Sequence, residues 1–328
     1  MNLQTFQKQF SNETVCRQFI EAIRWPAGRV CPHCGNDSST VIRANGRRPL
    51  RYQCKKCRRQ FTVTTKTALH ATKLPLSTWL LSMYLISSSS KGIASTILAK
   101  LIGTTQPTAW KVGHTIRKMM KSSNSELPLL QGIIELDEAY VGGKPPYVPG
   151  QPKKRGKGTS KSWVLIAVER RGPVRAVSID SEKVATMQPV INQHLCKSSH
   201  LISDMHRSHM AIGKQFAVHS YVNHSLREYS RGNVHTNTAE SFAGIVKRAR
   251  VGVFHYMSQL HLNRYMNEFE FRWNNRVPDE MLDKNGQTKT VMRPIPIMDM
   301  IILLLIRFSG YCLKRTKSWG IKDVVFNL

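Results

Sequence analysis

Two Cys-x-x-Cys pairs near the N-terminus are the feature that most restricts how this chain can fold. Cys31 and Cys34 form the first pair, Cys54 and Cys57 form the second, and 19 residues separate the pairs. Four thiolates at this spacing are typical of a tetrahedral Zn²⁺ site, to which each pair supplies two ligands through a tight turn. A redox role for one pair would leave the other unexplained. We therefore expect a structural zinc ribbon over residues 26–66.

The charge of the chain is strongly positive and unevenly distributed. The sequence has 49 Lys and Arg against 20 Asp and Glu, a formal net charge of +29. No acidic residue occurs between Ser38 and Ser125, whereas 16 basic residues do. Such a stretch is typical of a surface that binds phosphate, with nucleic acid as the first candidate partner and an anionic membrane as the second. The alternative is a basic surface that serves solubility alone.

Several features favour a soluble intracellular protein. The first ten residues contain no basic segment followed by an apolar one, as a signal peptide would. The apolar run from Ile301 to Ile306 is too short to cross a bilayer. Cysteines spaced for metal binding, rather than as a disulfide framework, also indicate a reducing compartment.

Residues 72–122 predict helices joined by a short turn at Gly103. This pattern favours a helix-turn-helix-like segment, in which the start of the second helix enters the major groove of DNA. The alternative is an ordinary helical hairpin that buries its apolar side chains. If the segment binds DNA, five polar side chains of the second helix are expected to contact it: Gln106, Thr108, Lys111, Arg117 and Lys118.

The stretch GIIELDEAYVG, residues 132–142, predicts a strand that carries three carboxylates. Successive side chains of a strand point to opposite faces, which places Glu135 and Asp137 on one face and Glu138 on the other. An acid near the C-terminal end of a strand can be presented in the crevice where other strand ends meet. We take Asp137 as the functional acid, with Glu135 and Glu138 as its competitors.

Two further acids have comparable positions. Asp204 ends a strand predicted over residues 199–204, and Glu240 lies in the first turns of a helix predicted over residues 237–249. Lys247 lies on the same stripe of that helix as Glu240. Three carboxylates suit two Mg²⁺ ions at a phosphodiester, because Mg²⁺ takes few carboxylates together with water and phosphate oxygens. The lysine would hold a phosphate as a point charge.

The predicted order of elements in the second half is β-β-β-α-β-α-β-α. Acids on the first strand, on a later strand and on a later helix make this the RNase H-like arrangement. The expected fold class is therefore mixed α/β, with an RNase H-like catalytic domain at residues 128–276 preceded by the zinc ribbon and the helix-turn-helix-like segment. An N-terminal helix at residues 1–25 and a helical extension at residues 277–328 complete the predicted organisation.

Five passages carry a resemblance to a known family. They are RWPAGRVCPHCG, YQCKKCRRQFTVTTKTALHATKLPLSTWL, LDEAYVGGK, SDMHRSH and HTNTAESFAGIVKRARVGVFHYMSQLHLNRYMNEFEFRWNNR. With them, nearly all of residues 4–276 resembles the bacterial insertion-sequence transposases of the acidic-triad (DDE) class that carry an N-terminal zinc ribbon. The chain departs from the pattern of that family at Lys66, where relatives tend to have Gly.

The resemblance implies an enzyme that acts on double-stranded DNA. The catalytic acids of the family fall on Asp137, Asp204 and Glu240, and its basic residue falls on Lys247. Such an enzyme binds the inverted repeats at the ends of an element, hydrolyses a phosphodiester to free a 3′-hydroxyl and joins that hydroxyl to target DNA. The resemblance also implies catalytic Mg²⁺ or Mn²⁺ held by the three acids, a homodimer or higher oligomer on DNA, and a cytoplasmic, nucleoid-associated location.

Further basic side chains are expected to contact DNA. They are Lys153, Lys154 and Arg155, in the Pro- and Gly-rich loop 142–158, and Arg248. For the histidines of the second half, structural roles are favoured over contacts with phosphate: His206, His209, His235 and His255. Two other functions stay open, a catalytically inactive or domesticated DNA-binding regulator and an RNase H-like nuclease without strand transfer.

Overall fold

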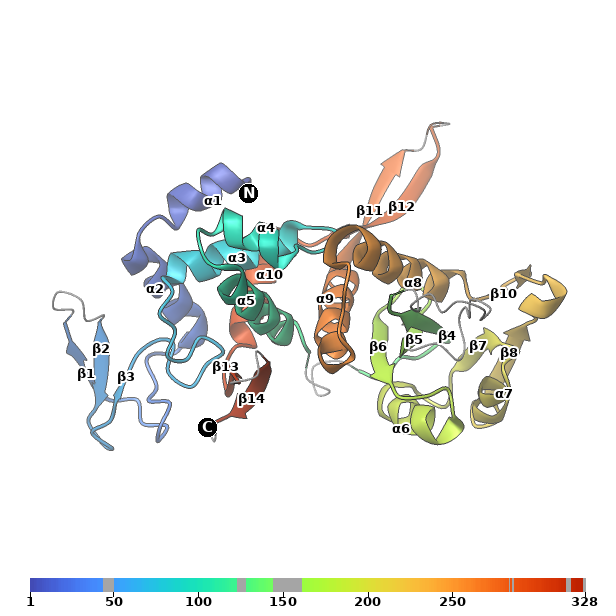
Figure 1. The fold of residues 1–328 in the computed structure, drawn as a ribbon, viewed down its shortest axis with the longest axis horizontal. Coiled ribbons are helices and arrows are strands. Elements are labelled where there is room, and N and C mark those ends of the chain that lie inside the picture. The colour runs from blue at the N-terminus through green and yellow to red at the C-terminus, as the bar shows by residue number, and fades with distance from the viewer. Residues whose placement is uncertain are drawn as a thin grey trace, which may run out of the picture. The chain divides into compact units, whose positions relative to one another are not determined.

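A computed structural model of the chain describes residues 1–43, 50–122, 128–143, 161–282, 284, 286–316 and 320–326. The chain forms two compact units (Figure 1). The N-terminal unit consists of Met1–Ser89, Ile93–Met120 and Ile295–Leu328, and the sheet unit consists of Ser90–Gly92 and Lys121–Pro294. The last residues of the chain therefore belong to the same unit as the first.

The N-terminal unit begins with two helices, α1 (Leu3–Gln9) and α2 (Glu13–Arg24). The single helix expected over residues 1–25 is therefore wrong. Asn12 interrupts it, because its side chain accepts a hydrogen bond from the Thr14 N–H and so caps the start of a second helix.

The ribbon contains three short antiparallel strands in the order β1-β2-β3. They are β1 (Ser39–Ile42), β2 (Arg51–Cys54) and β3 (Gln60–Phe61). Tyr52 and Phe61 are buried side by side with Trp25 packed against them, which gives the ribbon a small aromatic core. After the ribbon, Lys66 has a φ of 56°, a left-handed conformation that favours glycine. A glycine, as in the relatives, would suit this conformation better than Lys66, and the described contacts give no reason for the lysine.

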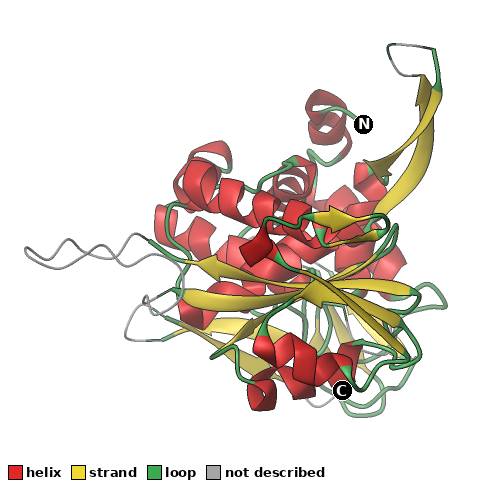
Figure 2. Cartoon of the chain, turned by 90° about the vertical axis from the view of Figure 1, so that its right-hand side faces the viewer, coloured by secondary structure: helices red, strands yellow, loops and turns green. Residues whose placement is uncertain are grey.

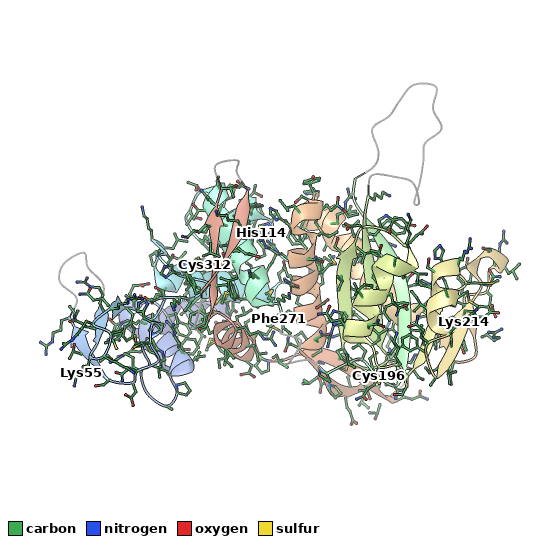
Figure 3. All side chains as sticks on the ribbon, turned by 90° about the horizontal axis from the view of Figure 1, so that it is seen from below. Lys55, His114, Cys196, Lys214, Phe271 and Cys312 are labelled. Atoms are coloured by element: carbon green, nitrogen blue, oxygen red, sulfur yellow. The ribbon has the colours of Figure 1, made fainter. Side chains whose placement is uncertain are left out.

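Helices fill the rest of the N-terminal unit. They are α3 (Leu76–Ser88), α4 (Ser95–Leu101), α5 (Gln106–Met119) and α10 (Ile297–Ile306). Gly103 turns the chain between α4 and α5 with a φ of 63°. Helix α10 packs against α2, α3 and α5, and a hairpin of β13 (Tyr311–Arg315) and β14 (Ile321–Val325) packs against α5. His114 of α5 and Cys312 of β13, both buried, are labelled in Figure 3.

The helical extension expected over residues 277–328 is wrong for most of its length. Besides α10 and the β13–β14 hairpin, it contains a second hairpin formed by β11 (Arg276–Leu282) and β12 (Thr288–Pro294). The second strand of each hairpin is rich in β-branched residues, which favour strands: β12 has two Thr and a Val, and β14 has an Ile and two Val. Within the described part of the chain, each helix is too short or too polar to span a bilayer.

A five-stranded sheet is the framework of the sheet unit. Its strands are β4 (Ile133–Val141), β5 (Ser162–Glu169), β6 (Val174–Ile179), β7 (His200–Asp204) and β8 (Val218–Val222). Their order across the sheet is β6-β5-β4-β7-β8. Strands β4, β5 and β6 are antiparallel neighbours, whereas β7 and β8 run parallel to β4. This mixed order is the RNase H-like arrangement that the sequence predicts.

Helices cover both faces of the sheet (Figure 2). They are α6 (Val184–His194), α7 (Arg207–Gly213), α8 (Asn237–Ala249) and α9 (Leu262–Asn274). Ile134 and Leu136 of β4 pack with side chains of α6 and α7. Ala139 and Val141 pack with side chains of α8 and α9. The alternation of faces predicted for β4 is confirmed, so Glu135 and Asp137 face α8, whereas Glu138 faces the opposite layer.

Short elements connect these helices and strands. They are η1 (His224–Leu226), β9 (Ser230–Arg231), β10 (Val234–His235), the π-helix η2 (Arg250–Phe254) and η3 (Gln259–His261). The β9–β10 hairpin leads into α8, and η2 continues directly from its end.

Side chains of α9 cover the free edge of β6. Asn274 accepts a hydrogen bond from Val174 N–H at 2.8 Å and donates one to the carbonyl oxygen of the same residue at 3.1 Å. The backbone N–H groups of Ala176 and Ser178 donate to Glu270 and Asn263. An exposed edge strand would present these groups for pairing with another chain. Helix α9 therefore completes the hydrogen bonding of the sheet at this edge.

We predict that Asn274→Ala lowers the free energy of unfolding by about 1–3 kcal/mol, because it leaves the Val174 N–H of β6 without its partner, while the Val174 carbonyl oxygen keeps its bond from Arg175. Urea unfolding measures the loss. Asn192→Ala is the matched control, since Asn192 is exposed and accepts a hydrogen bond from the Gln188 side chain at 2.8 Å, and its effect should stay within about 0.5 kcal/mol. Equal stability of the two variants would show that α9 does not support the edge.

Candidate active site and metal centres

The four cysteines of the ribbon converge on one point. Cys31 Sγ lies 3.7 Å from Cys57 Sγ, and Cys34 Sγ lies 3.6 Å from Cys54 Sγ. All four sulfur atoms lie within 4.8 Å of one another. Sulfur atoms at about 2.3 Å from a central ion in a tetrahedron are roughly 3.8 Å apart, so the cluster fits Zn²⁺.

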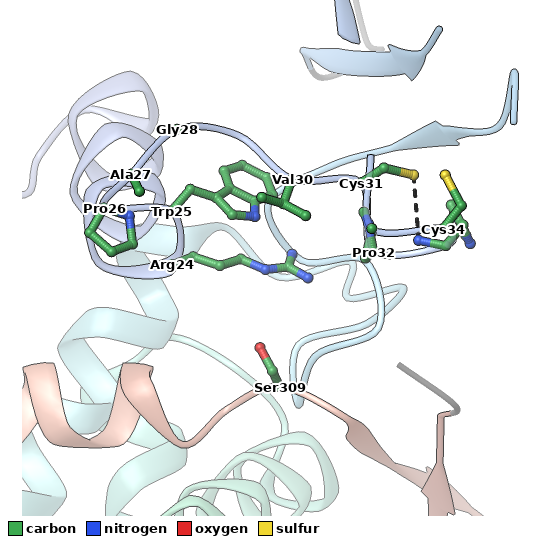
Figure 4. Close-up of a pocket in the computed structure, with 12 residues that line it drawn as sticks. Arg24, Trp25, Pro26, Ala27, Gly28, Val30, Cys31, Pro32, Cys34 and Ser309 are labelled. Carbon is green, nitrogen blue, oxygen red and sulfur yellow. Dashed lines mark hydrogen bonds between the residues drawn. The ribbon is translucent and has the colours of Figure 1, made fainter. Parts of the chain in front are cut away.

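Backbone N–H groups support the two knuckles of this cluster. The His33 N–H donates to Cys31 Sγ at 3.4 Å, in the knuckle drawn beside a pocket in Figure 4. The Cys57 N–H lies 3.5 Å from Cys54 Sγ in the second knuckle. The His33 ring is 3.4 Å from the carbonyl oxygen of Gln60, so it faces the ribbon rather than the sulfur atoms. The cysteines alone therefore form the ligand set.

The predicted acids of β4 and β7 lie where these parallel strands run side by side. Glu135 is paired with Ile202, so two residues further along each strand Asp137 is level with Asp204. Burial raises the pKa of Asp137 to about 7, and repulsion from Glu138, Asp204 and Glu240 adds to the rise. Asp137 is therefore near enough to Asp204 and Glu240 to be affected by their negative charge.

His209 lies between two of the carboxylates. Its Nδ1 is 2.5 Å from Asp204 Oδ1, its Nε2 is 2.8 Å from Glu138 Oε1, and its ring is fully buried. Burial acts to lower the pKa of His209, but the contacts with both acids outweigh it and raise the pKa to about 10. His209 is therefore an imidazolium that neutralises part of the acidic site, which is the kind of structural role expected for it.

Helix α8 brings the remaining predicted residues to the sheet. Glu240 lies in its first turn, is exposed, and accepts a hydrogen bond from Thr236 Oγ1 at 3.2 Å. Lys247 and Arg248 lie near its other end and are also exposed. The apolar face of the helix packs on β4, so Glu240 is held beside the strand that carries Asp137.

The acidic group fits hard divalent cations by its chemistry. Its donors are carboxylate oxygens, which are the ligands that Mg²⁺ and Mn²⁺ prefer. Carboxylate oxygens of Glu138 and Asp204 also lie within 4.8 Å of each other, whereas His209, as an imidazolium, offers no lone pair to a metal. Sequence reasoning did not find the contacts that His209 makes, because a histidine five positions after an aspartate is not a recognised ligand spacing.

The residues expected to bind DNA through α5 fall into two groups. Gln106 and Thr108 lie in the first turn, where Gln106 is exposed and donates to Ser95 Oγ at 2.8 Å. Arg117 is only 4% exposed, which leaves no surface for the phosphate contact that we expected of it. The correction has a physical cause, since the C-terminal half of α5 packs within its unit and against β13.

The other two basic residues of α5 are also engaged within the N-terminal unit. Lys118 pairs with Asp323 at 2.8 Å and lies 4.7 Å from the centre of the Tyr311 ring. Lys111 is partly buried, and burial lowers its pKa. Lys153, Lys154 and Arg155 lie outside the described residues.

We predict that Cys54→Ser abolishes zinc binding, because a three-sulfur site loses much of the roughly 10–16 kcal/mol with which structural zinc is held. Metal analysis of the purified protein should fall from about one zinc ion per chain to near none. Cys196→Ser is the control, because that thiol belongs to the sheet unit, outside the ribbon, and bonds to Ser198. A variant at Cys54 that keeps its zinc would show that the cluster is not the binding site.

We predict that His209→Gln, which keeps a polar side chain but removes the positive charge, lowers the free energy of unfolding by roughly 2–3 kcal/mol. This loss is smaller than that expected for a fully buried ion pair, because the Asp204 side chain is 32% exposed and water can partly solvate its charge. Chemical unfolding with and without Mg²⁺ tests it, and Mg²⁺ should restore part of the loss. His200→Gln, on the same strand as Asp204, alters only a contact with Ser220 of the neighbouring strand β8 and should show no such Mg²⁺ effect.

Comparisons with known proteins agree with this geometry. An ISXO2-like transposase domain matches residues 129–274, and a transposase zinc-ribbon domain matches residues 11–60. The uncharacterized protein in transposable element ISH50 of Halobacterium salinarum is 27% identical over 278 residues, which are 81% of this chain and 92% of that protein.

Solved structures show a weaker likeness. The Mos1 mariner paired end complex with Mn is 15% identical, and the Mos1 strand transfer complex is 14% identical. In each case the match covers 56% of this chain and 72% of the other, with a TM-score of 0.23. The two domain matches together span more than half of the chain, in the order ribbon and then acidic domain. The chain belongs to the insertion-sequence transposases of the DDE class that carry an N-terminal zinc ribbon.

Proposed function

We propose that this transposase binds the terminal inverted repeats of its insertion sequence, hydrolyses a phosphodiester at each end and joins the freed 3′-hydroxyl to target DNA. One observation carries the proposal. Asp137 of β4 is level with Asp204 of the neighbouring parallel strand β7, and α8, which carries Glu240, packs on β4. The protein as a whole has a net charge of +29, so a local group of carboxylates is unusual in it. Such a group is suited to bind divalent cations that contact the phosphate backbone of DNA.

Each side chain of the site has a proposed role. Asp137, Asp204 and Glu240 hold two Mg²⁺ or Mn²⁺ ions, which when bound activate the attacking oxygen and stabilise the leaving oxygen. His209 keeps Asp204 ionised and oriented, since its contact lowers the pKa of that carboxyl against the effect of burial. Lys247 holds a phosphate of the DNA as a point charge. No covalent protein–DNA intermediate is needed, so no Ser or Tyr nucleophile is assigned.

The DNA-binding surfaces are proposed from the exposed basic and polar residues that remain. Gln106 and Thr108 at the start of α5 are placed to reach DNA, and Arg248 extends the contact that Lys247 makes. Lys153, Lys154 and Arg155 belong to the same proposal. Joining two element ends to one target requires two active sites, so we propose a homodimer or higher oligomer that assembles on DNA in the nucleoid.

The proposed domains follow from these roles. Residues 26–66 are the zinc ribbon, residues 72–122 the DNA-binding segment, and residues 128–276 the catalytic domain. All four proposed catalytic residues belong to the sheet unit, two on its strands and two on α8, whereas the helix α5 belongs to the other unit. Recognition of the ends and chemistry are thereby assigned to different parts of the chain.

We predict that the protein cleaves and joins DNA that carries the inverted repeats flanking its gene, and only with Mg²⁺ or Mn²⁺. Asp137→Ala should lower the rate by roughly 10³-fold or more, which is about 4 kcal/mol of transition-state stabilisation. Asp180→Ala removes an exposed carboxylate at the end of β6 and should leave the rate unchanged.

A gel assay that separates cleaved from joined products decides between the candidate functions. Cleavage without joined product would identify a nuclease. Specific binding of the repeats without cleavage would identify a regulator. Either result would contradict the proposed strand transfer.

A further inference from the structure

Glu135 is the acid of β4 to which the proposed chemistry gives no role. Its side chain is 0% exposed and lies on the same face of the strand as Asp137. Burial of an ionised carboxylate is costly unless hydrogen bonds and a counter-charge compensate it. The partners of Glu135 therefore indicate what the buried charge does.

The first partners belong to the N-terminus of α8. Glu135 Oε2 accepts hydrogen bonds from the Thr238 N–H at 2.6 Å and the Ala239 N–H at 3.1 Å. Oε1 accepts one from Thr238 Oγ1 at 3.0 Å. The first amides of a helix have no partners within it, and a side chain at the N-cap usually supplies them. Thr236, the N-cap of α8, makes no such bond, so Glu135 caps the helix from the sheet.

The second partner is Arg170, which follows β5. Its guanidinium donates from Nε to Glu135 Oε1 at 3.0 Å, and a terminal nitrogen lies 2.8 Å from the same oxygen. The same side chain donates to the carbonyl oxygens of Asn233 at 2.9 Å and His235 at 3.2 Å. Arg170 therefore neutralises Glu135 and also holds the backbone that leads into α8.

We propose that Glu135 and Arg170 are positioning residues that set the third catalytic acid against the first. Asp137 lies two residues after Glu135 on β4, and Glu240 directly follows the capped Ala239 on α8. A shift of the first turn of α8 away from Glu135 would move Glu240 away from Asp137. This inference rests on the proposed function, in which Asp137 and Glu240 bind the catalytic ions.

Glu135→Gln tests the proposal, because an amide has almost the same shape but lacks the charge and directs an NH₂ group at the amides of α8. The expected result is a loss of Mn²⁺ affinity of about tenfold, the typical effect of altering a group that orients a metal ligand. Mn²⁺ binding, measured by electron paramagnetic resonance on the DNA-free protein, gives the affinity without any assay of activity. Hydrogen exchange at Thr238 and Ala239 should become faster.

Glu268→Gln is the matched control. Glu268 is also 0% exposed and pairs with an arginine, Arg272, but both lie on α9. This variant loses a comparable buried pair, so it should be less stable yet bind Mn²⁺ as the wild-type protein does. If Glu135→Gln fails to fold, Thr238→Val removes only the hydroxyl bond to Glu135 and should weaken Mn²⁺ binding by a smaller factor.

The outcomes separate the inference from the proposed function. Unchanged Mn²⁺ affinity in Glu135→Gln would overturn the positioning role, and so would unchanged affinity in Thr238→Val if only that variant folds. The proposed catalytic function would still be decided separately, by the DNA cleavage assay of Asp137→Ala. An equal loss of affinity in Glu268→Gln would show general loosening and overturn the role as well. A wild-type protein that binds no Mn²⁺ would overturn both.

Discussion

Repulsion between buried carboxylates is the constraint on which the sheet unit depends. Strand β4 carries three acids within four positions, and two of them contact a positively charged side chain. Glu135 is neutralised by Arg170 and capped by α8, and Glu138 contacts the imidazolium of His209. Asp137 accepts a hydrogen bond from the Glu138 N–H, and among the described residues it forms no ion pair with a basic side chain. The negative charge that the protein leaves uncompensated is therefore at Asp137, where divalent cations would complete the site.

The N-terminal unit shows how the end of the chain limits the surface that is left for DNA. Helix α10 packs among helices from the start of the chain, and the β13–β14 hairpin packs against α5. The hairpin provides Asp323, the partner of Lys118, while Arg117 is buried in the same unit. The basic residues of α5 therefore serve the packing of their own unit as much as any ligand. What α5 presents is its first turn, with Gln106 and Thr108, which is the part of such a helix that enters a groove.

Local patterns in the sequence predicted those elements whose residues decide their own structure. The alternation of apolar and acidic residues gave the two faces of β4, and α8 begins at Asn237 and ends at Ala249, as its periodicity indicates. The roles of Glu135 and His209 could not be predicted, because their partners lie far along the chain or in another element. The burial of Arg117 and the hairpins after residue 275 were missed for the same reason. Burial and pairing across long separations are tertiary properties, which periodicity does not contain.

The overall positive charge of the protein and the negative charge of its acidic site together explain why the proposed reaction requires metal ions. A net charge of +29 attracts DNA to the protein as a whole. At the acids, however, a phosphodiester would meet carboxylates and be repelled. His209 and Arg170 reduce this repulsion only at Glu138, Asp204 and Glu135, and both are held within the protein by those contacts. The DNA backbone can therefore approach Asp137 closely only when cations lie between them, so that binding of DNA and binding of metal at this site favour each other.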